Sequence, residues 1–194
     1  MGEQNGMEAY QRIFRETGAL HEGHFRLTSG LHSPVYFQCA LVLQYPRYTS
    51  LFAGKILTKF QGVGVDTVIS PAVGGIVIGQ EVGRQLGVRT IFSERQDNRM
   101  QLRRGFSIKP GERVLICEDV VTTGGSVFEV IALVRESGTE IVGVGYIVDR
   151  SGGTVQFGVR QHALMELNAQ TYTPENCPMC ARKIPITKPG SRSA

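Results

Sequence analysis

The fold of this chain is decided by the stretch Val114-Leu115-Ile116-Cys117-Glu118-Asp119-Val120-Val121-Thr122-Thr123-Gly124-Gly125-Ser126-Val127. The four apolar residues at its start are typical of a central strand in a parallel sheet, buried on both faces. Apolar residues at positions 127, 130, 131 and 134 then recur at helical spacing. Residues 122–126 are therefore expected to form the turn between strand and helix, at the carboxyl edge where open α/β sheets bind ligands.

The turn itself carries groups that bind a phosphate. Gly124 and Gly125 adopt backbone conformations closed to other residues and let amides approach a ligand closely. Thr122, Thr123 and Ser126 add hydroxyl donors beside the positive end of the following helix. A monoester phosphate fits such a turn.

Two acids, Glu118 and Asp119, stand at the end of the strand just before the turn. Carboxylates there repel a phosphate, but they accept hydrogen bonds from sugar hydroxyls or order a hydrated Mg²⁺ ion. Acids and turn together predict a ribose 5-phosphate site. The alternative is a tight turn with a helix cap, in which hydroxyls cap the helix and the acids are solvated. Because a cap needs only one or two of these features, we favour the ligand site.

A second glycine-rich turn lies at residues 74–79. It comes near the pattern GxxxxGK[ST] but supplies Gln80 where the phosphate-binding lysine belongs. The chain therefore lacks the lysine that a P-loop protein or a kinase of that type needs, and we do not expect either function.

Length and composition predict one α/β domain. A chain of 194 residues that is 41% hydrophobic can bury one core but is too short for two ordinary enzymatic domains. We expect a single domain over 1–194, with an N-terminal hood at about 7–45, a core at about 46–167 and a C-terminal tail at about 168–194.

Charge and cysteine usage narrow the class of protein. The formal net charge of +4 favours anionic partners, for which a phosphorylated substrate is sufficient. Aromatic residues make up only 8% and no long Lys/Arg block occurs, so we expect no nucleic-acid partner. Cys117 lies inside the expected central strand, which favours a reducing cytoplasm over a disulfide framework. No signal core and no apolar run of membrane-spanning length occurs.

The remaining pattern alternates strands with helices. Helices are expected at 7–17, 48–60, 76–86 and 127–135, and strands at 25–27, 35–37, 67–69, 90–92, 114–117 and 141–148. This alternation predicts a doubly wound parallel sheet. Residues 93–104 are almost wholly polar and rich in arginine, so we expect a mobile cationic loop there. Beyond 171 we expect a poorly packed tail.

The decisive stretch resembles, residue for residue, the phosphoribosyl pyrophosphate (PRPP) signature of the type I phosphoribosyltransferases. Further segments follow in the order seen in orotate phosphoribosyltransferases, and the resemblance spans nearly the whole chain. These segments are 27–30, 33–37, the turn at 74–75, the arginine-rich loop, 118–126 and 149–150. The resemblance implies a type I fold with a small N-terminal hood. It also implies transfer of the phosphoribosyl group of PRPP to N1 of orotate, giving orotidine 5′-phosphate and pyrophosphate in pyrimidine biosynthesis.

The resemblance also implies roles for individual residues. For PRPP they are Arg95, Arg99, Arg103, Glu118, Asp119, Val120, Val121, Thr122, Thr123, Gly124, Gly125 and Ser126, and for orotate they are Thr122, Arg150, Tyr36 and Phe37. Among these, Arg95, Arg99 and Asp119 are the catalytic candidates. The planar guanidinium of Arg150 would take the orotate carboxylate.

Each role has a structural alternative. Tyr36 and Phe37 are also what an ordinary strand core contains. Arg150 could form a surface ion pair with Asp149, and an arginine of the polar loop could be solvated without a catalytic role.

The resemblance further implies Mg²⁺ as cofactor, held mainly through substrate and water with no direct protein ligand assigned. A homodimer is implied as well, in which the arginine-rich loop closes onto the neighbouring subunit's site. Some positions depart from the family. Many members have lysine where Thr28, Gly74 and Gln96 stand, and Arg99 replaces a common loop lysine, so a proton-transfer role there becomes doubtful.

Two other functions stay open. A phosphoribosyltransferase acting on a purine or another base would keep the PRPP site without needing a carboxylate partner at Arg150. A non-catalytic regulator would keep the fold as a PRPP sensor and bind nucleic acid through its basic surface. The arginine-rich loop discriminates against the regulator, since a sensor need not cover a leaving group.

One further motif is a cysteine pair near the C-terminus. Cys177 and Cys180 have the spacing of two zinc ligands, but no second CxxC and no nearby histidine pair occurs in the sequence. Packing in a loop or a redox-labile pair is therefore the favoured interpretation. His21, His24 and His32 cluster in the hood, where we expect surface histidines.

Overall fold

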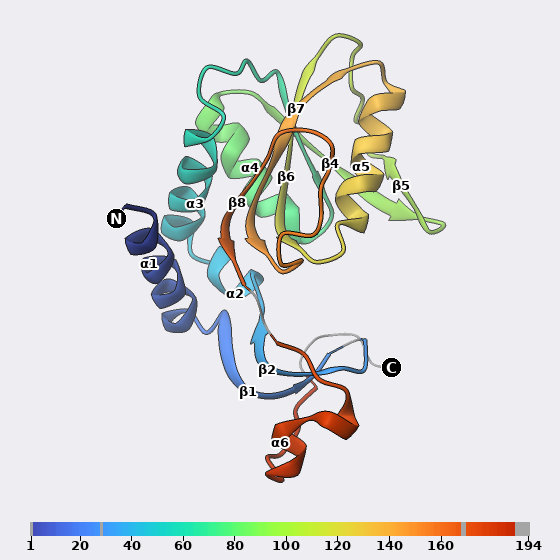
Figure 1. The fold of residues 1–194 in the computed structure, drawn as a ribbon. Helices are drawn as coiled ribbons and strands as arrows, with labels where there is room; N and C mark the ends of the chain where they lie inside the picture. The colour runs from blue at the N-terminus through green and yellow to red at the C-terminus, as the bar shows by residue number, and fades with distance from the viewer. Residues whose placement is uncertain (1, 28, 168–169, 189–194) are drawn as a thin grey trace. The chain divides into compact units, whose positions relative to one another are not determined.

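The computed structural model describes residues 2–27, 29–167 and 170–188, and side chains from residue 6 onward (Figure 1). The contacts between Cα atoms divide the chain into two compact units. One unit combines the described parts of 1–42 and 168–194, and the other comprises 43–167. The interpretation of the whole chain as a single domain stays a prediction.

The larger unit is built on a six-stranded sheet with the strand order β5-β4-β3-β6-β7-β8. The strands are β3 (Thr67–Pro71), β4 (Arg89–Gln96), β5 (Arg99–Leu102), β6 (Arg113–Val121), β7 (Glu140–Asp149) and β8 (Gln161–Glu166). All neighbours are parallel except β4 and β5, which are antiparallel. The predicted doubly wound parallel sheet is confirmed, with one antiparallel strand at its edge.

Helices cover both faces of this sheet. In Figure 1, α3 (Pro46–Thr58) and α4 (Gly74–Leu86) lie on one side and α5 (Gly125–Glu136) on the other. Ile116 of β6 packs in the same core cluster as the buried face of α5, and its neighbour Leu115 is fully buried too. Burial on both faces explains why the strand is apolar without alternation.

The chain order places a topological switch point between β3 and β6. From β3 the chain continues to β4 on one side, and it returns with β6 on the other side of β3. The turns that follow β3 and β6 therefore lie next to each other at the carboxyl edge of the sheet. Open α/β sheets have their ligand crevice at such a point.

The smaller unit joins the two ends of the chain. It contains α1 (Gly2–Glu16), the antiparallel strands β1 (Leu20–Arg26) and β2 (His32–Phe37), the short helix η1 (Pro174–Asn176) and α6 (Pro178–Ala181). In the sequence, α2 (Ala40–Leu43) spans the boundary between the units. The rings of Phe14 and Phe37 pack edge to face at 4.9 Å in the core of the smaller unit.

The described part of the C-terminal tail is mostly exposed, in keeping with a poorly packed segment, but its backbone pairs with the β1–β2 hairpin, which we did not predict. The backbone of Thr187 is hydrogen-bonded to the β1 strand on both sides, through Arg26 N and His24 O. Tyr172 exchanges two backbone hydrogen bonds with His32 of β2. The polar, proline-containing sequence had hidden this pairing because its hydrogen bonds are made by the backbone, to strands far away in the sequence. Residues 189–194 lie outside the described part.

The expected cationic loop at residues 93–104 is instead an ordered hairpin of β4 and β5. Asp97 and Asn98 have φ values of 51° and 60° and form its two-residue turn. Met100 is buried in the core cluster and holds the hairpin against the unit. A turn of the residue types Asp and Asn is a hairpin signal that the high polarity of the segment obscured. Among the described residues, no helix is long and apolar enough to cross a membrane.

Candidate active site

The turn between β6 and α5 forms a pocket at the carboxyl edge of the sheet. It is lined by Glu118 and by residues 120–127. Gly124 has a φ of 74°, and a Cβ atom there would lie 2.8 Å from Val155 Cγ1 and 3.0 Å from Phe157 Cε1. Only glycine fits this position, because both its backbone conformation and its close packing exclude a side chain.

The pocket presents unsatisfied amide groups from the first turn of α5. Within the described part of the chain, no side chain caps this helix end, so the hydroxyls of Thr122, Thr123 and Ser126 do not have the capping role considered as an alternative. The first turn also has no acidic residue. An anion is the natural partner for such a helix end.

Of the acidic pair, Glu118 lines this pocket and Asp119 is its neighbour in the chain. Asp119 N donates to Glu118 Oε1 at 3.0 Å, and Val120 N donates to Asp119 Oδ1 at 2.9 Å. Glu118 is buried, whereas Asp119 is partly exposed. Burial raises the pKa of Glu118 well above its usual value, and the negative charge of Asp119 raises it further. The two adjacent acids therefore differ in character: Glu118 favours its protonated form, and Asp119 is the accessible carboxylate.

We predict that Glu118→Gln stabilises the protein at neutral and alkaline pH. The pKa of Glu118 is raised on folding, so the folded state loses stability as pH rises above the usual glutamate value. Glutamine keeps the hydrogen-bonding shape without ionising. The free energy of unfolding should rise by about 1 kcal/mol at pH 8, and the difference from wild type should vanish near pH 4. Denaturant unfolding of both proteins across this pH range measures it, and a gain that does not depend on pH would contradict the assignment.

The turn after β3 contacts the acidic pair. A Cβ atom on Gly74 would lie 2.6 Å from both carboxylate oxygens of Asp119. The side chain that many family members have at this position therefore conflicts with Asp119 in the observed conformation. The turns after β3 and β6 form one site at the switch point, a proximity that the sequence did not reveal.

Arg150 directly follows β7 and lies beside the turn between β6 and α5. Its backbone amide donates to the carbonyl of Val121, the last residue of β6, at 2.8 Å. The neighbouring Asp149 is buried and accepts hydrogen bonds from Ser151 N at 2.6 Å and from the Tyr146 hydroxyl at 3.5 Å. Burial, and then the charge of Asp149, raise the pKa of Tyr146 to about 12. Asp149 therefore has hydrogen-bond partners inside the unit, and the alternative of an ion pair with Arg150 stays untested.

The candidate arginines lie on or beside the β4–β5 hairpin. Arg95 Nη2 is 2.6 Å from Glu129 Oε1 on α5, and Arg104 Nη2 is 2.8 Å from Glu94 Oε1. Arg99 begins β5, and Arg103 directly follows that strand, with both residues exposed. In Figure 1 the hairpin projects outward past α5. Among the described residues, the lining of the β6–α5 pocket includes none of these arginines.

Tyr36 and Phe37 belong to the smaller unit. Phe37 is buried against Phe14, as in an ordinary strand core. Tyr36 is partly exposed, and its hydroxyl donates to Gln38 Oε1 at 2.8 Å. Their predicted contact with a pyrimidine stays a prediction. Thr28, where we noted a missing family lysine, lies outside the described residues.

Comparison with known proteins agrees with this fold. A family described as "Phosphoribosyl transferase domain" matches residues 48–157, which include the switch point and the β6–α5 turn. The chain therefore belongs to the phosphoribosyltransferase family.

Individual relatives define the branch of that family. The orotate phosphoribosyltransferase of Chlorobium phaeobacteroides (strain DSM 266) is 59% identical over 181 residues, covering 93% of this chain and 94% of that protein. The enzyme of the same name from Desulforamulus reducens is 56% identical over 180 residues, covering 93% and 94%. The crystal structure of orotate phosphoribosyltransferase from Aeropyrum pernix matches with a TM-score of 0.70 and 25% identity, covering 80% of this chain and 92% of that one. The chain is thus placed among the orotate phosphoribosyltransferases.

Proposed function

We propose that the protein transfers the 5-phosphoribosyl group of PRPP to N1 of orotate, producing orotidine 5′-phosphate and pyrophosphate for pyrimidine biosynthesis. One observation carries the proposal: the β6–α5 turn, the acidic pair and Arg150 all lie at the adjacent carboxyl ends of β6 and β7. A ribose phosphate and a base with a carboxylate require these groups side by side. The four cysteines are free, and on that ground we place the enzyme in a reducing cytoplasm.

PRPP binding is assigned to the turn and the acidic pair. The amides of the first turn of α5, with Thr122, Thr123 and Ser126, bind the 5-phosphate. Glu118 and Asp119 accept hydrogen bonds from the ribose hydroxyls, and the charge of Asp119 strengthens these bonds. The carboxyl edge of β6 thus orients the sugar with its anomeric carbon free to react.

The reaction breaks the bond between C1 of the ribose and the pyrophosphate oxygen, and it forms a bond between C1 and N1 of orotate. Positive charge develops on the ribose ring and negative charge on pyrophosphate, so fixed charges near both groups lower the barrier. Asp119 fits a hydrated Mg²⁺ ion because its carboxylate is partly exposed, whereas Glu118 favours its proton. When bound, Mg²⁺ neutralises charge on the leaving pyrophosphate. We assign Asp119 to the ribose side, where its negative charge favours the developing cation.

Selection of the base is assigned to Arg150. A guanidinium binds a carboxylate through two parallel hydrogen bonds. Uracil lacks the carboxylate and would leave the arginine without this partner, so it is disfavoured as a substrate.

We propose a homodimer in which the β4–β5 hairpin serves the site of the other subunit. The support is that the hairpin projects past α5 (Figure 1) and that none of its described residues lines the β6–α5 pocket of its own chain. Its exposed arginines, Arg99 and Arg103, can then cover the pyrophosphate of a neighbouring site.

Mixing two inactive variants tests this arrangement. In a heterodimer of Asp119→Asn and Arg99→Ala subunits, one site combines an intact acidic pair with an intact hairpin from the other subunit. After subunit exchange at equal concentrations, activity should recover to about one quarter of the wild-type value. Activity no higher than the average of the two variants would show that each hairpin serves its own chain. Co-purification of an untagged variant with a tagged one from the mixture shows that exchange has taken place.

The proposed reaction is tested by incubating the purified protein with PRPP, Mg²⁺ and one of four bases, while pyrophosphate release is followed. Orotate should support turnover, and uracil, adenine and hypoxanthine should not. Turnover with a purine would replace the proposal with a purine phosphoribosyltransferase. Binding of PRPP without turnover on any base would favour the regulator.

A further inference from the structure

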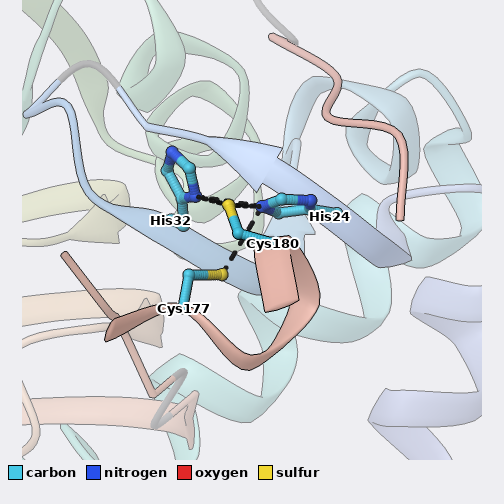
Figure 2. Close-up of side chains that lie close together, drawn as sticks. All are labelled: His24, His32, Cys177 and Cys180. Carbon is cyan, nitrogen blue, oxygen red and sulfur yellow. Dashed lines mark hydrogen bonds between the residues drawn. The ribbon is translucent and has the colours of Figure 1, made fainter. Parts of the chain in front are cut away.

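Four side chains of types that bind metals in other proteins converge in the smaller unit, and none of them is among the residues assigned above. They are His24 of β1, His32 of β2, and Cys177 and Cys180 at the start of and within α6. Their ligand atoms all lie within 4.8 Å of one another. Figure 2 shows the two imidazoles on the hairpin and the two thiols on the C-terminal segment pointing toward a common centre. Of the three histidines expected on the surface, His21 is exposed as predicted, but His24 and His32 are buried. The two buried histidines supply the pair that the sequence did not place near the cysteines.

Three of four separations among these atoms match the edges of a tetrahedral site, and the fourth, between the two imidazole nitrogens, is shorter. Zinc bonds of about 2.0–2.1 Å to nitrogen and about 2.3 Å to sulfur give tetrahedron edges of about 3.3–3.8 Å. His24 Nε2 lies 3.5 Å from Cys177 Sγ and 3.7 Å from Cys180 Sγ. His32 Nδ1 lies 3.3 Å from Cys180 Sγ and 2.9 Å from His24 Nε2. A single ion fits among four atoms this close, whereas a cluster of several ions needs a wider cage.

The orientation of His24 is fixed by a hydrogen bond on the far side of its ring. His24 Nδ1 lies 2.8 Å from the carbonyl oxygen of Ile184. Because a carbonyl only accepts, Nδ1 carries the proton and Nε2 presents its lone pair to the cluster. A ligating histidine is commonly held in this way, with the second nitrogen bonded to a carbonyl or a carboxylate.

Burial adds a second reason for an ion. His24, His32 and Cys177 are 4%, 6% and 3% exposed, and Cys180 closes the cluster on its exposed side. Two imidazoles and a thiol removed from water need strong partners.

We propose that these four side chains bind one Zn²⁺ ion. Since all four positions of the tetrahedron are taken by protein, the site is structural, with no open position for a substrate.

The consequence is a crosslink between the two ends of the chain. Cys177 and His24 are 153 residues apart in the sequence. The segment that carries the cysteines has little apolar surface of its own, with Cys177 and Met179 as its buried hydrophobic residues in the described part. An ion bound by both partners would hold the C-terminal segment on the hairpin more firmly than the backbone hydrogen bonds of Thr187 and Tyr172 alone.

Metal content of the tag-free protein tests the proposal. Mass spectrometry of protein purified in reducing buffer should find about one zinc per chain. The double variant Cys177→Ser, Cys180→Ser should retain less than about one tenth of that amount. The matched controls His21→Ala, an exposed histidine on the same strand, and Cys39→Ala, a cysteine outside the cluster, should keep the ion. Cobalt(II) loaded in place of zinc should give the intense visible absorption of a tetrahedral thiolate site.

A second measurement uses wild-type protein, so it tests the zinc site even if the cysteine variants fail to fold. In wild-type protein, titration with a mercurial reagent should release zinc in step with the modification of two thiols. Removal of the ion should also lower the unfolding temperature and expose the C-terminal segment to protease. When the metal is added back, both properties should return to those of the untreated protein. Wild-type protein that stays free of zinc after reduction and incubation with the ion would overturn the proposal. A Cys177–Cys180 disulfide in protein freshly purified without oxidant would do so as well.

Discussion

Replacing Asp119 by asparagine is expected to lower kcat/KM for PRPP about 100-fold while the fold stays intact. The amide keeps the shape of the side chain but loses the charge that strengthens hydrogen bonds to the ribose hydroxyls and favours the developing cation. Pyrophosphate release measured at varied PRPP and saturating orotate gives this value.

The same variant carries an internal control for unfolding. The charge of Asp119 helps to raise the pKa of Glu118, so its removal lets that pKa fall toward the usual value. Asp119→Asn should therefore unfold at the same temperature as wild type or a higher one. Glu136→Gln, an acid-to-amide change at the exposed end of α5, should leave activity unchanged. Wild-type PRPP kinetics in Asp119→Asn would remove this carboxylate from the mechanism.

Replacing Arg150 by alanine is expected to raise the KM for orotate about 100-fold and to leave the KM for PRPP within about twofold. The side chain is assigned to the carboxylate of the base, and its backbone amide, which bonds to Val121, is unaffected by the change. Initial rates at varied concentrations of each substrate separate the two constants.

Arg150→Lys is the matched variant for this prediction. Lysine keeps the positive charge but cannot form two parallel hydrogen bonds, so its KM for orotate should lie between those of wild type and Arg150→Ala. The preference for orotate over uracil should shrink in the same order. An equal rise in the KM values for PRPP and orotate would show that Arg150 supports the site as a whole and does not bind the orotate carboxylate.

The core of the fold and the β6–α5 turn could be predicted because their signals are local. Residues 114–127 are consecutive in the sequence, and the pocket is lined from within this stretch by Glu118 and residues 120–127. The order of the residues alone therefore places the acids beside the turn. The buried strands are equally direct, since a strand buried on both faces must be apolar throughout.

Other features escaped because their stability depends on distant partners. Strand β8 combines partly buried polar and apolar residues, and it is held as a strand by pairing with β7. Residues 93–101 of the β4–β5 hairpin are polar except for Met100, and they also form an ion pair with α5, between Arg95 and Glu129. The sequence contains the residues that make these contacts, but it does not show which of them are close together in the folded chain.

The cluster of His24, His32, Cys177 and Cys180 is the extreme case. Each residue alone has an ordinary explanation, and the pattern becomes visible only when the hairpin and the C-terminal segment are side by side. Spacing rules for metal sites detect ligands that are neighbours in the sequence, and this site draws its halves from opposite ends of the chain.

The composition of the smaller unit also bears on how the protein is made. Residues 43–167 are contiguous, so this unit can fold as soon as that stretch has left the ribosome. The β1–β2 hairpin emerges first, but its partner segment, which includes Tyr172 and Thr187, is among the last to be translated. The hairpin therefore lacks its backbone hydrogen-bond partners during most of synthesis. Premature termination anywhere before residue 170 would leave these backbone groups of the hairpin without Tyr172 and Thr187.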